Sequence, residues 1–403
     1  MLRQRALRDV QNEFKNIIEK EAKNYELMNL EIFNCSPEGS FKSANIRMPL
    51  FGIEEPVPTD PPTPWHIFMF EYEDVFNLKN LELLVQDKQP GDSDVDPDLM
   101  AAYNSLVDYI AGKEAHDVCL SKVCKTRDGN LPASSSETDI AYSLAVHLFA
   151  PLTVGACILD NHSRAWPKSC PGGCNGTVQK GPTGIGAIQI WHGFADILIS
   201  QKIPLKIWKE VPEIVTNEHD EDSEEDSDSV TEGASLSPCA MYSLNIETKK
   251  NDLAMKQPLC QLIAQTITNS FAQVNENKQL SQFLIPSFGC SNNQIVIFGY
   301  DSENDVLVKK VDPILLWTGA DNIWHLSVSA VVQIWMYMHF PLLMLPSLAN
   351  QYDTNIRSNF HSSHTIEFFR KYSKCQTKGF PHEGGVKLLN TRYSRPTKKL
   401  KTN

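Results

Sequence analysis

The sequence predicts a mixed α/β fold in which a central mixed sheet is flanked by helices. Apolar residues typical of strands predominate at 194–199 and 294–300, and at 241–249 side chains alternate between an apolar and a polar face. Between the last two lies 258–274, which has the length and apolar content of a helix. The apolar fraction of 41% excludes a fibre or a wholly disordered chain. Strands and helices that follow one another in this way predict an α/β or α+β arrangement.

The first 130 residues are expected to form a helical, loop-rich N-terminal extension. Apolar residues spaced by about 3.6 positions predict an amphipathic helix over residues 1–30. A second partly helical stretch covers 66–124, with a turn-rich interruption at 89–94.

A core domain is predicted over 134–348. It should begin with a helix whose capping box runs from Ser134 to Glu137. Strands are expected at 187–191 and 194–199, with a turn at His192.

The core is interrupted by an insertion at 201–240. Ten carboxylates and no Lys or Arg lie between residues 213 and 232, so this insertion is expected to be a disordered, solvated loop. After the strand 241–249 and the helix, strands at 294–300 and 306–311 should pair with each other.

An uncharged segment runs from Trp324 to Leu345, and its 22 residues could span a membrane. It also holds His325, His339 and Pro341, which a lipid-facing helix would struggle to accommodate. A buried core helix is therefore favoured over membrane attachment.

Charge is unevenly placed along the chain. Residues 351–403 carry 11 Lys/Arg and 3 Asp/Glu, a net +8, while the whole chain carries −12, so the remainder carries −20. The tail 350–403 is expected to be basic and largely disordered, and its run at 395–401 is of nuclear-localisation type, or merely solubilising. Ten cysteines and an N-terminus without an apolar run favour an intracellular protein, nuclear over cytoplasmic.

Chemistry-bearing side chains gather at the end of the strand 241–249. Because side chains alternate between faces, Glu247 and Lys249 project side by side. Asp196 lies within an apolar run, where a charged residue needs a partner or a metal. Two carboxylates on neighbouring strands are suitable ligands for Mg²⁺ or Mn²⁺.

This pattern of an Asp, then Glu-x-Lys on the next strand, then a glutamine-bearing helix resembles the PD-(D/E)XK nuclease superfamily. The resemblance covers about residues 134–311 and implies a restriction-endonuclease-like core similar to that of recombination exonucleases. It implies that Asp196 and Glu247 bind the metal and that Lys249 is catalytic. It also implies that Gln261, one of three glutamines spaced four apart on the helix, supports the site.

Glu137 could supply a third acidic group from the first helix, although its capping role is the favoured interpretation. The expected function is a metal-dependent nuclease that cleaves DNA, with RNA as an alternative, and that uses no small-molecule cofactor. The competing hypothesis is a catalytically inactive nuclease fold that serves as a nuclear nucleic-acid-binding or protein-interaction module.

A zinc knuckle is a further alternative. Cys170 and Cys174 enclose Pro-Gly-Gly, and His162 and His192 flank them. Free loop thiols are the favoured interpretation, because the spacing between the cysteines is wider than the usual two residues.

Overall fold

The computed structural model describes most of the chain, and the fold and the sites are those of this described part. It comprises residues 2–19, 24–34, 39–48, 69–86, 96–124, 135–162, 165–201, 242–249, 253, 256–320, 323–346, 348, 356–363 and 365–375. The turn at 89–94, the acidic run at 213–232 and the basic run at 395–401 lie outside these residues.

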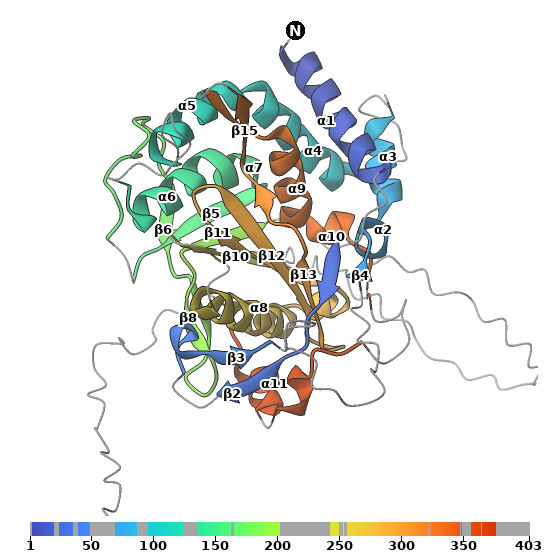
Figure 1. Cartoon of the computed structure of the whole chain (residues 1–403), viewed down its shortest axis with the longest axis vertical. Coiled ribbons are helices and arrows are strands. Elements are labelled where there is room, and N and C mark those ends of the chain that lie inside the picture. The colour runs from blue at the N-terminus through green and yellow to red at the C-terminus, as the bar shows by residue number, and fades with distance from the viewer. Residues whose placement is uncertain are drawn as a thin grey trace, which may run out of the picture.

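A ten-stranded mixed sheet forms the centre of the molecule, so the predicted α/β class is confirmed (Figure 1). Its strands, in spatial order, are β4 (Met69–Phe70), β1 (Tyr25–Leu27), β13 (Val306–Lys310), β12 (Gln294–Asp301), β11 (Ile285–Cys290), β10 (Tyr242–Thr248), β9 (Ile197–Gln201), β5 (Gly155–Asp160) and β6 (Gln179–Gly181), with β14 (Ile314–Leu315) paired to β12. Neighbouring strands are antiparallel except for the parallel pairs β10–β11 and β5–β6.

Helices cover both faces of this sheet (Figure 1). One face carries α1 (Leu2–Glu19), α4 (Pro97–Ala111), α5 (Lys113–Cys124), α6 (Glu137–Leu144) and α9 (Val328–Met338). The other face carries the long helix α8 (Lys256–Glu276), and beyond it lie β2 (Glu31–Asn34), β3 (Asn45–Arg47) and α11 (Ile366–Tyr372).

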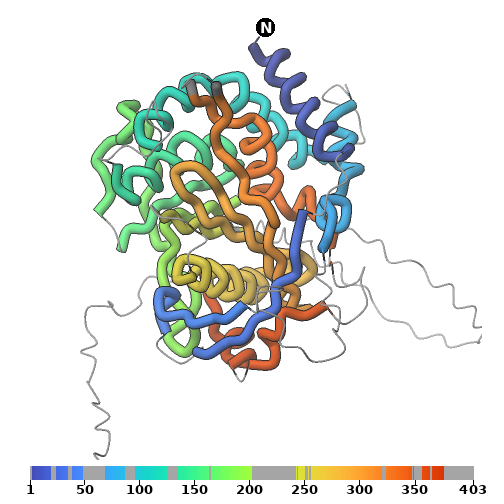
Figure 2. Tube along the Cα trace, viewed as in Figure 1, coloured from blue at the N-terminus to red at the C-terminus, as the bar shows by residue number. Residues whose placement is uncertain are grey.

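Smaller elements complete the described chain. They are α2 (Tyr72–Val75), α3 (Leu78–Val85), α7 (Ala150–Leu152) and α10 (Phe340–Leu343), the paired strands β7 (Gly184–Gly186) and β8 (His192–Phe194), the paired strands β15 (Trp317–Ala320) and β16 (Ile323–Leu326), and short 3₁₀ turns at Phe41–Ser43, Lys278–Gln282 and Phe360–Ser362. Figure 2 shows how segments distant in sequence meet: the N-terminal strand β1 runs alongside β13.

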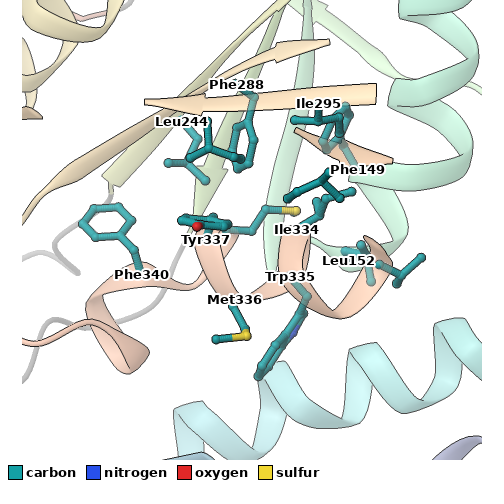
Figure 3. Packing of buried hydrophobic residues seen from close by; sticks show 14 of the residues in the cluster. Phe149, Leu152, Leu244, Phe288, Ile295, Ile334, Trp335, Met336, Tyr337 and Phe340 are labelled. Carbon is teal, nitrogen blue, oxygen red and sulfur yellow. The ribbon is translucent and has the colours of Figure 1, made fainter. Parts of the chain in front are cut away.

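The main hydrophobic core lies between the sheet and α9 (Figure 3). Phe288 and Leu244 point from the sheet toward Tyr337 of α9. On the far side of α9, the indole Nε1 of Trp335 donates a 2.9 Å hydrogen bond to the carbonyl of Ala102 in α4. Because α9 is enclosed on all sides, it can be apolar around its whole circumference without facing lipid.

The uncharged segment 324–345 does not form one long helix. Its first residues belong to strand β16, Ser327 caps α9 by accepting from the amide of Ala330, and His339 ends it before the short α10. Among the described helices, none has both the length and the apolar character needed to cross a membrane.

Some of the other predicted helices and strands are confirmed, and others are wrong. The strands predicted at 241–249, 294–300 and 306–311 and the helix at 258–274 are present. The predicted strand at 187–191 is instead a turn between β7 and β8, and the first helix ends at Glu19. In that turn Ile190 and Trp191 are buried, so the segment has the apolar content of a strand without its conformation.

Among the strands that were not predicted, β5 and β11 pair with the strands of the candidate site, β9 and β10. Together with α6, β9, β10 and α8 they set the order of the elements around the site. Leaving aside short intervening pieces, the chain runs α6, β5, β9, β10, α8, β11, with α6 and α8 both in contact with β10. The glutamine-bearing helix therefore follows directly on the strand of Glu247.

Candidate active site

Asp196 and Glu247 lie at the same end of two adjacent strands. In the antiparallel pair β9–β10, Ile197 is opposite Ile246, so the residues just beyond this pair are Asp196 and Glu247. Asp196 Oδ2 accepts a 2.7 Å hydrogen bond from the amide of Thr248. Each acidic residue is only 3% exposed. The two buried acidic residues are therefore cross-strand neighbours at the end of the β9–β10 pair.

Three donors hold the carboxylate of Glu247. Its Oε1 accepts from Lys249 Nζ at 2.6 Å and from Gln261 Nε2 at 2.8 Å, and its Oε2 accepts from Gln265 Nε2 at 2.9 Å. Residues 261 and 265 are one helical turn apart on α8 and therefore face the same strand. Hydrogen bonds to a charged acceptor are about twice as strong as neutral ones, so this carboxylate has a fixed orientation.

The Lys249 side chain is charged and turned toward the carboxylates. Burial lowers its pKa, but Glu247, followed by Asp196 and Glu137, outweighs burial and holds the pKa above its ordinary value. An ammonium with a raised pKa is a hydrogen-bond donor at neutral pH.

Glu137 is a third acidic residue near the ammonium. It occupies the first position of α6, and the capping box of that helix is formed by Ser136 and Asp139. The expected capping role of Glu137 is therefore wrong. Its charge contributes instead to the raised pKa of Lys249. The first-turn position of an acidic residue was visible in the sequence, but its distance from Lys249 was not.

The three regularly spaced glutamines of α8 differ in their surroundings. Gln261 and Gln265 are buried against Glu247, whereas Gln257 is exposed. The four-residue spacing placed all three glutamines on one site-facing side of the helix, but only Gln261 was assigned to the site.

A layer of buried polar groups continues along α8 beyond Glu247. Within the described residues, the amide oxygen and nitrogen of Asn245, Oε1 of Gln265, Nδ2 of Asn269 and Oγ of Ser287 have no protein hydrogen-bond partner. Buried polar atoms of this kind are rare in a helix–sheet interface whose only role is packing. The face of β10 that carries Glu247 is therefore polar, while Leu244 and Ile246 face the apolar core.

The donor set fits a hard divalent cation such as Mg²⁺ or Mn²⁺. Oxygen donors from two carboxylates are available at Asp196 and Glu247. Since Oε1 of Glu247 already accepts two hydrogen bonds, Oε2, which accepts one, is the oxygen with capacity for a metal. Beneath the site, burial and then the charges of Asp196 and Glu247 raise the pKa of the Cys290 thiol, which keeps it neutral.

Comparison with known proteins returned no matching family model, no matching curated protein and no matching solved structure. The function of the chain is therefore inferred from its own residues and geometry.

Proposed function

We propose that the chain is a metal-dependent nuclease that hydrolyses phosphodiester bonds of DNA, with RNA as an alternative substrate. The observation that carries this proposal is the meeting of Asp196, Glu247 and Lys249 at the end of two adjacent strands. A restriction-endonuclease-like core is part of the proposal. It is supported by the order of helix, three strands, glutamine-bearing helix and strand around the site.

In this proposal Asp196 and Glu247 would hold Mg²⁺ or Mn²⁺. When bound, such an ion supplies positive charge at the phosphate and lowers the pKa of a water ligand. Gln261 and Gln265 do not touch the substrate in this scheme. They fix the rotamer of Glu247 so that its oxygen faces the neighbouring strand.

Lys249 contributes a positive charge and hydrogen-bond donors. One of its N–H groups is donated to Glu247, and the others would hold a phosphate oxygen or an attacking water. A fixed ammonium stabilises the charge that develops on a phosphate in the transition state, and loss of one such donor typically costs about 100- to 1,000-fold in rate.

The second candidate is a catalytically inactive nuclease fold that binds nucleic acid or protein. One observation favours it: the carboxylate of Glu247 is already occupied by three donors, one of them an ammonium at 2.6 Å. A site saturated in this way can be stable without a metal.

Cleavage of end-labelled single-stranded DNA, double-stranded DNA and RNA should be measured with Mg²⁺, with Mn²⁺ and with chelator. The wild type should cleave at least one substrate only in the presence of metal. Asp196→Asn and Lys249→Met should each reduce the rate by about 100-fold or more. Gln257→Met, at the exposed glutamine of α8, should behave as the wild type and serves as the matched control.

The control for positioning is Gln265→Met. Because this residue holds Glu247 without reaching the substrate, its change should lower the rate and weaken metal activation while Gln257→Met does neither. Equal residual cleavage in every variant would show contamination and contradict the proposal. Metal-independent nucleic-acid binding with no cleavage by the wild type would favour the inactive module.

A further inference from the structure

We propose that Cys119, His147, Cys170 and Cys174 form a structural zinc site. Ring and thiol ligand atoms of Cys119, His147 and Cys174 lie within 4.8 Å of one another. Cys170 joins them, because both its Sγ and the Sγ of Cys174 lie 3.2 Å from Nε2 of His147. Three sulfurs around one imidazole nitrogen are a Cys₃His donor set.

These four residues come from three separate parts of the fold. Cys119 lies on α5, and the two remaining cysteines lie in the loop between β5 and β6. His147 lies at the centre of a single π-helical turn, Ala145–Phe149, that continues α6. A π-helical turn adds a residue to the helix and often marks a functional site. Such long-range convergence is what a structural metal site requires.

The contacts around His147 prepare it as a ligand. Its Nε2 faces the sulfurs, while its Nδ1 lies 3.2 Å from Nδ1 of His116, whose ring stacks on Tyr109 with centroids 4.8 Å apart. With the Nδ1 proton of His147 donated to His116, Nε2 presents its lone pair to the sulfurs. Metal-bound histidines are usually oriented by a partner of this kind on the other ring nitrogen.

The loop is also shaped for this arrangement. The amide of Gly176 donates to Sγ of Cys174 at 3.2 Å, a hydrogen bond that stabilises a thiolate. Gly173 has a φ of +82°, and an added Cβ at Gly172 would lie 2.6 Å from the carbonyl oxygen of Cys119. Because only glycine permits both the backbone turn and the close approach, the Gly-Gly pair brings the two loop cysteines onto α5.

The donor set distinguishes this site from the carboxylate site. Thiolates and imidazole are soft or borderline ligands and select Zn²⁺ over Mg²⁺ or Mn²⁺. His162 and His192, the histidines expected from the sequence, are placed elsewhere: the first stacks on Phe194 and the second has Nδ1 at 3.0 Å from the carbonyl of Ile190. Cys170 and His147 are buried, and Cys119 and Cys174 are half-buried. Because four protein ligands complete a tetrahedral zinc site and leave no position for a substrate, the role is structural.

Metal content of the full chain, expressed with zinc and purified without chelator, tests the proposal. About one zinc per chain is expected by elemental analysis. Replacement by Co²⁺ should give the absorption of a tetrahedral ion and a sulfur-to-cobalt charge-transfer band. Removal of the metal by chelator should lower the melting temperature, and zinc should restore it.

Single substitutions test which side chains bind the ion. Cys174→Ser should weaken zinc affinity by at least about tenfold in a competition with a chromophoric chelator. Cys157→Ser is the matched control, since Cys157 is a buried thiol of β5 whose Sγ faces the carbonyl of Ala145, and it should leave the affinity unchanged. His116→Gln keeps all four ligands, so it should weaken affinity about tenfold while the cobalt spectrum keeps its tetrahedral form.

Three outcomes would overturn the proposal. One is a folded wild-type protein that takes up neither zinc nor cobalt and shows all ten thiols on denaturation. Another is a disulfide between any two of the four residues in protein purified under reducing conditions. Retention of zinc by Cys174→Ser at wild-type affinity would likewise contradict it. None of these measurements depends on nuclease activity.

Discussion

Removing the charges of Glu247 and Lys249 singly and together should reveal strong coupling between them. The two side chains are 4% and 16% exposed and their charged atoms are 2.6 Å apart. At an effective dielectric constant of about 20, such a pair attracts by roughly 6 kcal/mol. Solvent screening of the partly exposed Lys249 and relaxation of the remaining partner reduce this attraction. We therefore expect a coupling energy of about 2–4 kcal/mol in the free energy of unfolding.

The assay is urea unfolding at neutral pH without divalent ions, followed by tryptophan fluorescence, for wild type, Glu247→Gln, Lys249→Met and the double variant. Contacts of residue 247 with the two glutamines change equally in both arms of the cycle and cancel. The exposed pair Arg370–Glu367, 3.0 Å apart, is the control and should couple by about 0.5 kcal/mol. A coupling below about 0.5 kcal/mol at the buried pair would refute the geometry and mean that Lys249 points to solvent.

Two further predictions concern pH and packing. Burial lowers the pKa of His339 from 6.5 to about 4, so the unfolded chain binds a proton first as pH falls, and stability should decrease by about 2 kcal/mol between pH 7 and about pH 5. Urea unfolding of His339→Asn should lack this share of the decrease, and an unchanged pH dependence would contradict the assignment. Gly172→Ala would place a Cβ 2.6 Å from the backbone oxygen of Cys119 and should cost about 1–3 kcal/mol by the same assay. Gly112→Ala, whose nearest contact would be 3.6 Å, should change stability by less than about 1 kcal/mol, and equal effects at the two glycines would sink the packing argument.

The α/β class and the candidate residues could be identified from the sequence because each depends on a local pattern. The candidate residues are Asp196, Glu247, Lys249 and Gln261. A strand of alternating character shows which side chains share a face, and a helix with regular spacing shows which glutamines align. Strand register then brought these local groups together, and only the structure displays that step.

What the sequence did not reveal depends on contacts between distant segments or on unusual composition. Strand β11 contains Pro286 and Gly289 in the interior of the sheet, where both residues argue against a central strand. His147 and Cys119 lie on two different helical segments, and the other two cysteines lie in a loop. No known spacing of metal ligands along a sequence therefore links the four residues. Their convergence follows from the π-helical turn and from the packing of α5.

The pairing of β1 with β13 has a consequence for how the sheet ends. Without Tyr25–Leu27, the backbone amides and carbonyls of β13 would form an open edge of five residues, able to accept a strand from another molecule. With β1 in place, the outermost strand is β4, which has only two residues. A short outer strand offers little backbone for intermolecular pairing. Strands β1 and β4 therefore protect this edge of the sheet against self-association, whatever chemistry occurs elsewhere on it.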